Sequence, residues 1–321
     1  MIHYFVEIVY ICKNNIGYKF FYMISIALFV YNRPEHTQRT LLSLQRANNA
    51  DKCSLYIFSD GAKSQKDCAK VNEVRRVCSD VSGFASVSII ERESNFGLAK
   101  NIISGLSDLF EVHERVLVLE DDLAVSYGFI DYMVSALDFY KNMGVFSISA
   151  YTPNVAIPDT YKSSTYVVPR TCSWGWATWR DRWKMVDWNV SDFDEFISNG
   201  KSRSAFNKAG DDLTPMLLKQ QLGVINSWSI RFTYAAFKCG QLSVYPVRSL
   251  VENCGVDGSG TNMKSSSRYE SQLTKEIDLN SFVDNIQVNY SILRSFRSFY
   301  DTSFIRRIIN YLKIRKYIFR L

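Results

Sequence analysis

Three consecutive acids, Glu120, Asp121 and Asp122, give the sequence its strongest chemical signal, and they directly follow the apolar residues 116–119. A short apolar run of this kind predicts a buried strand, which places the acids at the strand's end. Adjacent carboxylates repel one another unless a cation or hydrogen-bond donors compensate their charge. Mg²⁺ and Mn²⁺ prefer carboxylate oxygens and bridge to phosphates. This acidic trio therefore favours a divalent-metal site, and an acidic turn exposed to water is the alternative.

Two other polar residues follow predicted strands in the same way. Asp60 comes after residues 55–58, and its carboxylate could accept a hydrogen bond from a nucleobase N–H. Arg33 stands next to a predicted helix start, where a guanidinium could hold a phosphate. Each also has a structural alternative: Asp60 would cap the turn before Gly61, and Arg33 would form a surface salt bridge.

The elements that must position these residues alternate along the chain. Apolar runs at 24–30, 55–58, 87–90, 116–119 and 145–149 predict strands, and segments with helical periodicity separate them. Strands that alternate with helices predict an α/β fold with a mostly parallel, doubly wound sheet. Such sheets bind ligands at the carboxyl ends of their strands. We therefore expect Arg33, Asp60, Arg92, Asn95 and the acidic trio to converge on one edge.

After residue 150 the pattern changes to aromatics, turns and short helices. Helices are expected near 213–222 and 227–238, and strands at 244–245 and 249–251. The tryptophan-rich run 174–183 could line a sugar site or pack against the sheet, and the sequence leaves both open. Residues 258–260, Gly-Ser-Gly, could form a closing lid or an ordinary surface loop.

Six motifs in order give the chain a family resemblance over residues 23–265. They are residues 29–34 (FVYNRP), 59–61 (SDG), 95–101 (NFGLAKN), 119–123 (LEDDL), 173–176 (SWGW) and 256–261 (VDGSGT). The chain resembles GT-A type glycosyltransferases. Within them it is similar to the N-acetylglucosaminyltransferase branch that initiates complex N-glycans, and to related bacterial polysaccharide glycosyltransferases.

The resemblance implies a nucleotide-sugar donor, a UDP-sugar, together with Mn²⁺ or Mg²⁺. By carry-over, Asp122 would be the direct metal ligand, and Glu120 and Asp121 would contact the donor sugar and ribose. Asp60 would recognise the uracil, Arg33 the diphosphate, and Asn95 the base or ribose side. The implied activity is an inverting transfer of a hexose or N-acetylhexosamine to a glycan in bacterial surface polysaccharide synthesis, such as that of an O-antigen.

An inverting transfer needs a base for the acceptor hydroxyl, and here the chain departs from the eukaryotic relative. Where that enzyme has an acidic pair before a tryptophan, this chain has Asn226 and Ser227 before Trp228. The candidate bases are Asp181, Asp211, Asp212 and Asp257, of which we favour Asp212 and Asp257. The alternative for each is a helix cap or loop residue.

The charge distribution points to a membrane rather than to nucleic acid. The net charge of +6 equals the six basic residues of segment 303–321, which carries no acid, so the rest of the chain is balanced. In that segment Ile305, Ile308, Ile309 and Leu312 recur at helical spacing. A basic amphipathic helix is typical of contact with an anionic membrane, and packing on the protein itself is the alternative. Together with the resemblance to bacterial polysaccharide enzymes, this tail leads us to expect a lipid-linked acceptor at the inner face of the cell membrane.

Cysteine and histidine usage bounds the compartment and excludes some chemistry. The seven cysteines include no C-x-x-C pair, and the three histidines lack the H-x-x-x-H spacing, which argues against a zinc site. So few histidines also argue against a histidine-dependent triad. An odd number of cysteines with no secretory signal favours reduced thiols in a cytoplasmic protein. We divide the chain into an extension (1–22), a nucleotide-sugar-binding region (23–150), an acceptor-side region of the same catalytic domain (151–265) and a helical tail (266–321).

Two other functions share some of these features. A nucleotidyltransferase can use a similar sheet and metal carboxylates, but residues 31–34 are not the Gly-rich, basic phosphate loop that such an enzyme carries after its first strand. A non-catalytic glycan-binding module with a decayed site would explain the missing base. The intact acidic trio opposes it.

Overall fold

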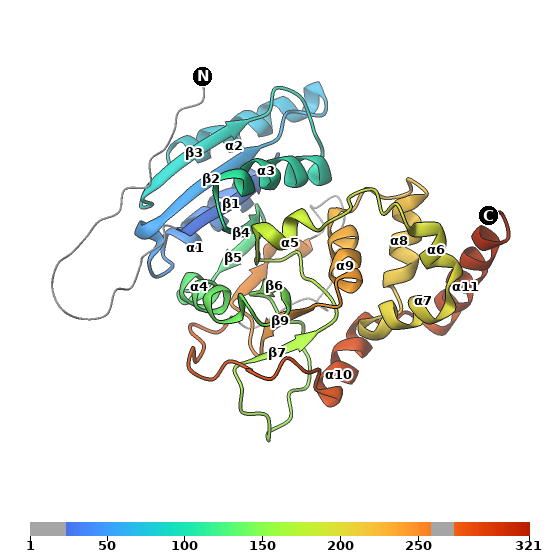
Figure 1. The fold of residues 1–321 in the computed structure, drawn as a ribbon. Helices are drawn as coiled ribbons and strands as arrows, with labels where there is room; N and C mark the ends of the chain where they lie inside the picture. The colour runs from blue at the N-terminus through green and yellow to red at the C-terminus, as the bar shows by residue number, and fades with distance from the viewer. Residues whose placement is uncertain (1–23, 258–272) are drawn as a thin grey trace.

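The computed structural model describes residues 24–257 and 273–321. A sheet of eight strands in the order β3-β2-β1-β4-β8-β6-β9-β7 forms its centre (Figure 1). Six strands run in one direction, while β7 and β8 run antiparallel to their neighbours. The expectation of an α/β fold with a mostly parallel sheet is confirmed. The strands are β1 (Ile24–Val30), β2 (Cys53–Ser59), β3 (Ser86–Glu91), β4 (Arg115–Glu120), β6 (Val145–Ser149), β7 (Thr165–Val168), β8 (Trp176–Trp179) and β9 (Leu242–Pro246).

Helices cover both faces of the sheet, because side chains along each strand alternate between two apolar layers. On β1, Ile26 and Leu28 face one layer, while Ala27 and Phe29 face the other. The first layer contains α1 (Pro34–Gln45), α2 (Cys68–Ser79), α4 (Phe129–Tyr140) and α10 (Tyr290–Tyr300). The second contains α3 (Leu98–Val112), α5 (Arg180–Lys184) and α9 (Trp228–Lys238). The sheet is therefore doubly wound, as expected.

A separate group of helices lies beside the sheet, at the right of Figure 1. It consists of α6 (Phe193–Ser198), α7 (Gly200–Phe206), α8 (Leu213–Gln221) and α11 (Phe304–Ile318). These helices share an apolar cluster of their own around Phe196, Phe206 and Leu217, to which α9 contributes Tyr234. We call this group the helical lobe.

Short elements complete the described chain. Strands β5 (Leu123–Val125) and β10 (Val251–Asn253) form a small antiparallel sheet next to the end of β4. Four 3-10 turns are η1 (Ala50–Lys52), η2 (Gln65–Asp67), η3 (Asn207–Ala209) and η4 (Cys254–Asp257). The strand expected at 249–251 therefore begins two residues later, at Val251.

The stretch before α10 corrects an expectation. The sequence of residues 264–300 predicts a loosely packed linker and a helix that lead to the tail. The helix is present as α10, but residues 274–283 lie against the sheet. Phe282 is buried against Tyr132 and Tyr140, and the Ser164 N–H donates to the Ser281 carbonyl at 2.7 Å. That linker prediction is wrong for this stretch, because one aromatic anchor fixes it.

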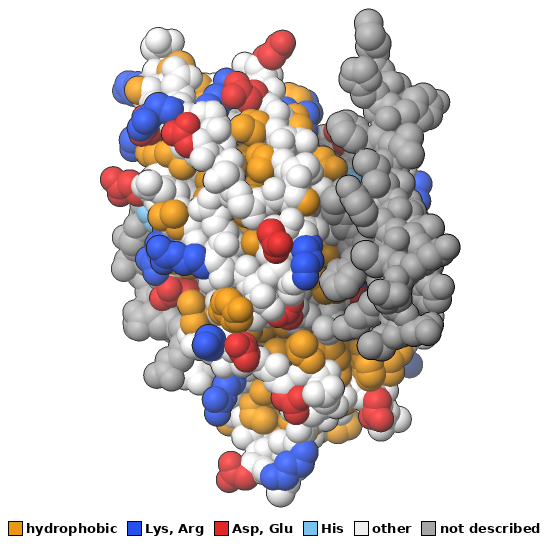
Figure 2. Space-filling view, turned by 90° about the vertical axis from the view of Figure 1, so that its left-hand side faces the viewer, with side chains coloured by type: hydrophobic (Ala, Val, Ile, Leu, Met, Phe, Trp, Pro, Cys, Tyr) orange, Lys and Arg blue, Asp and Glu red, His pale blue; other side chains and the backbone are white. Residues whose placement is uncertain are grey.

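The domain boundaries expected from the sequence stay predictions. The central sheet extends across the boundary expected at residue 150, because β7, β8 and β9 lie in the same sheet as the earlier strands. The expected extension 1–22 lies outside the described residues. Among the helices described, none is long and apolar enough to cross a bilayer. On the face in Figure 2, basic and acidic side chains are interspersed, and hydrophobic ones occur in small groups.

Candidate active site

The acidic trio lies where β4 ends, and the chain after β1 contacts it directly. The Arg33 guanidinium forms ion pairs with both Asp121 and Asp122, the latter at 2.9 Å. The Tyr31 N–H donates to the Asp121 carboxylate at 3.3 Å, and the Thr40 hydroxyl donates to the Asp121 carbonyl at 2.9 Å. Since β1 and β4 are neighbours in the sheet, their ends bring Arg33 and the trio together as expected.

Burial makes the charge of this trio costly. Burial and the charges of Asp122 and Asp121 raise the pKa of Glu120 to about 8. Burial also raises the pKa of Asp121, although Arg33 opposes the change. For Arg33 burial acts to lower the pKa, but Asp121 and Asp122 outweigh it and raise the pKa overall. One guanidinium therefore leaves part of the trio's negative charge uncompensated.

The segment after β10 covers Asp122. Asn253 pairs with Leu123, and the Cys254 N–H donates to the Asp122 carbonyl at 2.7 Å. At Gly255 a side chain would collide with the Asp122 carboxylate and come within 3.0 Å of Arg33 Nη1. Sequence analysis missed this close approach, for which the glycine was the only signal. Asp257 ends the same turn, η4, but its side chain and the expected lid at 258–260 lie outside the described residues.

Asp60 lies at the end of β2 and is buried. Its carboxylate accepts four hydrogen bonds: from the backbone N–H groups of Gly61 (2.9 Å), Phe96 (2.7 Å) and Gly97 (2.9 Å), and from the Asn95 side-chain amide (3.1 Å). A carboxylate has about four acceptor positions. A nucleobase that hydrogen-bonds Asp60 would therefore replace one of these donors. The structure thus brings Asp60 and Asn95 together, in a contact that also has a structural role.

Tyr31 joins these two groups of residues into one edge. Its backbone N–H contacts Asp121, while its hydroxyl accepts a hydrogen bond from the Lys63 N–H at 3.1 Å, in the chain that follows Asp60. Arg92, at the end of β3, donates to the Asn101 side-chain oxygen at 3.1 Å and to the Ser104 hydroxyl at 3.3 Å. The expected convergence at the carboxyl ends of the strands is confirmed.

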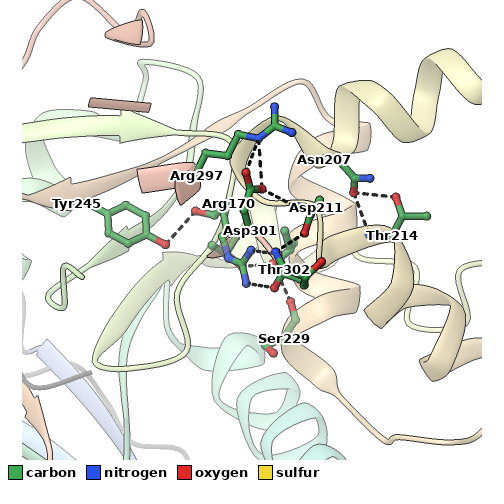
Figure 3. A network of polar contacts seen from close by, with 12 residues as sticks. Arg170, Asn207, Asp211, Thr214, Ser229, Tyr245, Arg297, Asp301 and Thr302 are labelled. Atoms are coloured by element: carbon green, nitrogen blue, oxygen red, sulfur yellow. Dashed lines mark hydrogen bonds and ion pairs between the residues drawn. The ribbon is translucent and has the colours of Figure 1, made fainter. Parts of the chain in front are cut away.

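Asp212 is held by a different network. It forms a bidentate pair with Arg170, at 2.8 and 2.9 Å, and the Arg170 guanidinium lies over the Tyr300 ring at 3.7 Å. Figure 3 shows the network around Arg170, in which Asp211 accepts from the Thr302 N–H at 2.7 Å. No contact among the described residues joins Asp212 to the acidic trio. The geometry favours the structural alternative for Asp212.

Asp181 is likewise engaged with a neighbour. It pairs with the Arg182 guanidinium and accepts from the Arg182 N–H at 3.0 Å. Together with Asp211, which also pairs with Arg307, three of the four acids considered as bases have structural contacts. Asp257 is the fourth.

The tryptophan run is mostly a packed core. Trp176, Trp179 and Trp183 are each at most 3% exposed, and Trp176 stacks on Trp228 with ring centres 5.0 Å apart. Trp174 is only half-buried and contacts the Tyr151 ring at 4.6 Å. Of the two possibilities left open by the sequence, packing against the sheet is therefore correct for these three rings.

The negative charge of the acidic trio suits a divalent cation, but the side chains that the structure describes do not alone supply enough ligands to hold one. Within residues 24–257 and 273–321, no group of three or more His, Cys, Asp or Glu side chains is placed to hold a metal ion. The uncompensated carboxylates of the trio, however, are the donor type that Mg²⁺ and Mn²⁺ prefer. An ion bound there would need further oxygen ligands, such as those of a diphosphate.

No model of a known protein family matches the chain, and no curated protein sequence does. Three solved structures show a distant likeness. The mannosyltransferase PcManGT from Pyrobaculum calidifontis, in complex with GDP-Man and Mn²⁺, is 14% identical with a TM-score of 0.36, over 59% of this chain and 52% of that one. Residues 1–349 of S. aureus TarS are 13% identical to this chain with a TM-score of 0.39, over 72% of this chain and 60% of that one.

The third structure is the galactosyltransferase LgtC with donor and acceptor sugar analogues, at 12% identity and a TM-score of 0.37, over 67% of this chain and 70% of that one. The chain thus spans about half the length of PcManGT, the first of these structures. At these TM-scores the likeness establishes no shared activity for this chain.

Proposed function

We propose that the chain is a metal-dependent glycosyltransferase that moves a sugar from a UDP-sugar to a glycan. The observation that carries the proposal is the acidic trio, in which Asp121 is buried and pairs with Arg33, as does Asp122, at the same sheet edge as the Asp60–Asn95 contact. A carboxylate cluster with excess negative charge suits a cation and a diphosphate, and the neighbouring loop offers polar groups for a nucleoside. The order of the six sequence motifs supports the same reaction class.

In this proposal each residue has a distinct task at the site. Asp122, the most exposed carboxylate of the Arg33 pair, binds Mn²⁺ or Mg²⁺ together with the donor's diphosphate. When bound, the ion neutralises charge on the departing diphosphate. Arg33 contacts the diphosphate, Glu120 and Asp121 orient the sugar and ribose, and Asp60 and Asn95 shape the nucleoside side.

The transfer itself forms one bond and breaks another. The acceptor oxygen bonds to the anomeric carbon with inversion, the bond to the diphosphate breaks, and a carboxylate takes the hydroxyl proton. Asp257 is our candidate for that base, because it ends the turn η4, whose Gly255 packs directly against the Asp122 carboxylate. Asp212, in contrast, forms an ion pair with Arg170. The transferred sugar is a hexose or N-acetylhexosamine.

We also propose that α11 holds the enzyme on an anionic membrane, near a lipid-linked acceptor. Ile305, Ile308, Ile309 and Leu312 remain exposed, so the apolar stripe predicted from the sequence does not pack on the protein. A different stripe of α11, formed by Ile314, Tyr317 and Ile318, packs on the apolar cluster that the other helices of the helical lobe share. The free stripe and the basic residues of α11 together fit a surface of anionic lipid. The enzyme would work at the cytoplasmic face, in bacterial surface polysaccharide synthesis.

A second candidate is a glycan- or nucleotide-sugar-binding module without activity. It is favoured by one observation: Asp181, Asp211 and Asp212 are all engaged in structural contacts. Such a module would still bind the nucleotide. Binding and turnover must therefore be measured separately.

Calorimetric titration of the full chain with UDP, with and without Mn²⁺, tests the proposal. We expect metal-dependent UDP binding and hydrolysis or transfer of a UDP-sugar. Asp122→Asn should weaken UDP binding in Mn²⁺ at least about tenfold, roughly 1.4 kcal/mol. Asp138→Asn is the matched control, because it alters an exposed carboxylate that pairs with Arg115.

Each outcome decides between the candidates. Wild-type binding without Mn²⁺ dependence, or an Asp122→Asn variant that binds like Asp138→Asn, would overturn the metal assignment. Metal-dependent UDP binding with no turnover of any UDP-sugar would favour the binding module.

A further inference from the structure

A pocket of about 290 Å³ lies between α3 and the start of α9, and its lining includes no residue of the acidic trio. Its lining consists of Lys100, Ile103, Ser104, Asn226 and Arg231. We call it the α3–α9 pocket. Two of its residues are basic and none is acidic.

Arg231 is a partly buried cation whose described partners are all neutral. Its guanidinium donates to the carbonyls of Ser227 (3.1 Å) and Trp188 (3.0 Å), and to the side-chain oxygen of Asn226 (3.2 Å). No carboxylate of the described residues forms an ion pair with it. Burial lowers the pKa of Arg231, as expected for a cation that lacks a counter-charge.

Lys100 brings a second positive charge from the facing helix. Its ammonium lies over the Phe96 ring at 4.1 Å, and it has no carboxylate partner among residues 24–257 and 273–321. Ser104, one turn along, accepts a hydrogen bond from Arg92 at 3.3 Å, so a third cation contacts a residue of the pocket lining.

The start of α3 adds nothing to this field, because the Asp60 carboxylate already accepts hydrogen bonds from the Phe96 and Gly97 N–H groups there, at 2.7 and 2.9 Å. The positive charge of the pocket therefore comes from its two cationic side chains, which belong to separate helices.

We propose that the α3–α9 pocket binds an anionic group, phosphate or carboxylate, carried by the acceptor glycan. This inference rests on the proposed function, and it narrows the acceptor of the proposed glycosyltransferase to a glycan that carries a negative charge. The diphosphate of the donor is already assigned to Arg33, and no described contact joins Lys100 or Arg231 to Arg33 or to the trio. Helix α9 itself packs on the central sheet, because Trp228 at its start stacks on Trp176 of β8, which pairs in register with Val118 of β4.

The test uses inorganic phosphate, glucuronate and glucose as probes of the full chain, followed by amide chemical shifts. Phosphate or glucuronate should shift the amides of Lys100, Ser104 and Asn226, and glucose should not. Lys100→Gln should weaken binding of the anion at least about fivefold, and Lys100→Gln with Arg231→Gln at least about tenfold, because charge-assisted hydrogen bonds are lost. Lys208→Gln, the same charge change at an exposed residue outside the pocket, should leave binding unchanged.

Lys100 is exposed, so Lys100→Gln keeps the test decisive even where Arg231→Gln disturbs folding. The proposal is overturned by equal shifts with glucose, by equal weakening in Lys208→Gln, or by UDP with Mn²⁺ displacing phosphate from the pocket. Calorimetry with UDP and Mn²⁺ distinguishes the two proposals. Unchanged UDP binding in Lys100→Gln supports an acceptor role for the α3–α9 pocket. If the chain binds the anion but no UDP, the proposed glycosyltransferase activity is overturned and the pocket is an anion site alone.

Discussion

At Gly255 the site has almost no spare room, and this gives a sharp residue-level prediction. A methyl group there would collide with the Asp122 carboxylate and press on Arg33. Gly255→Ala should therefore displace the proposed metal ligand and weaken Mn²⁺-dependent UDP binding by about tenfold or more, with the fold retained. Calorimetric titration, together with circular dichroism, measures both quantities.

Gly200→Ala is the matched control. It adds the same methyl group at the start of α7, where the nearest atom, on Arg203, is at an ordinary 3.5 Å. Equal UDP affinities for the two variants would show that the contact between Gly255 and Asp122 does not matter for binding.

The cysteines provide a prediction about protonation. Burial raises the pKa of both Cys53 and Cys78 to about 12, so at pH 8 almost none of either thiol is the reactive thiolate. Cys239 is exposed. Iodoacetamide at pH 8 should label Cys239 about 100-fold faster than Cys53 or Cys78, as peptide mass spectrometry would show. Urea should remove the difference, and fast labelling of Cys78 in the native chain would contradict the burial described here.

How far single residues could be predicted depended on whether their partners were visible in the sequence. The trio was clear, because three acids after an apolar run have few structural uses. Its pairing with Arg33 was less clear, since Arg33 precedes Asp121 by 88 residues. The pairing of Asp212 with Arg170 was not foreseen, because Arg170 lies in a loop whose sequence carries no recognisable pattern. Three of the four groups that donate to Asp60 are backbone N–H groups, and these could not be predicted from residue types.

At the scale of elements, α11 has two apolar stripes with different roles. Ile314, Tyr317 and Ile318 pack on the helical lobe, while Ile305 and Ile309 remain exposed beside basic residues. Ile305→Ser with Ile309→Ser should reduce sedimentation with vesicles of anionic lipid at least about tenfold. Removing roughly 1.5 kcal/mol or more of apolar burial per side chain explains the size of the effect.

The same experiment contains its own controls. Thermal stability should change little in this double variant, because neither side chain packs on the protein. Leu222→Ser, an exposed apolar change on α8, should leave vesicle binding intact. Wild-type sedimentation that does not depend on anionic lipid or on salt would rule out the electrostatic part of the attachment.

Elements were predictable where periodicity was undisturbed. The strands at 24–30 and 145–149 have the expected bounds because every residue in them is buried, so the apolar run and the strand coincide. Strands β7 and β8 were not predicted. Each has four residues, and β8 consists of Trp, Ala and Thr within a run that also suited a sugar site. Their pairing depends on distant strands rather than on local sequence.

Across the whole molecule, a polar junction ties the sheet, the helical lobe and the C-terminal helices together. Arg170, after β7, pairs with Asp212 at the start of α8 and covers the Tyr300 ring of α10. Arg307 of α11 pairs with Asp301 at 3.1 Å and with Asp211. Figure 3 shows how Asp211, Asp301 and Thr302 meet in this junction. The C-terminal segment is thus part of the fold in addition to being the proposed membrane contact.

This arrangement changes what a truncation would do. From the sequence alone, deleting the chain after Asp301 should release the protein from membranes and spare its turnover. In the structure the deletion also uncovers the apolar cluster that Ile314 and Ile318 protect, and it removes the bond from the Tyr317 hydroxyl to Asp194, 2.9 Å long. Ile314 and Ile318 are partly buried, and a fully buried isoleucine contributes roughly 1.5–3 kcal/mol, so we expect the truncated chain to lose about 2 kcal/mol or more of unfolding free energy.

Urea unfolding followed by tryptophan fluorescence measures this loss against the wild type and against Ile305→Ser with Ile309→Ser. The double variant should detach from vesicles with an unchanged unfolding midpoint, while the truncated chain should detach with a lower one. Because one apolar stripe of α11 packs on the protein and the other is exposed, only the truncation should reduce both vesicle binding and the free energy of unfolding. A truncated chain as stable as the wild type would mean that Ile314, Tyr317 and Ile318 do not secure the helical lobe.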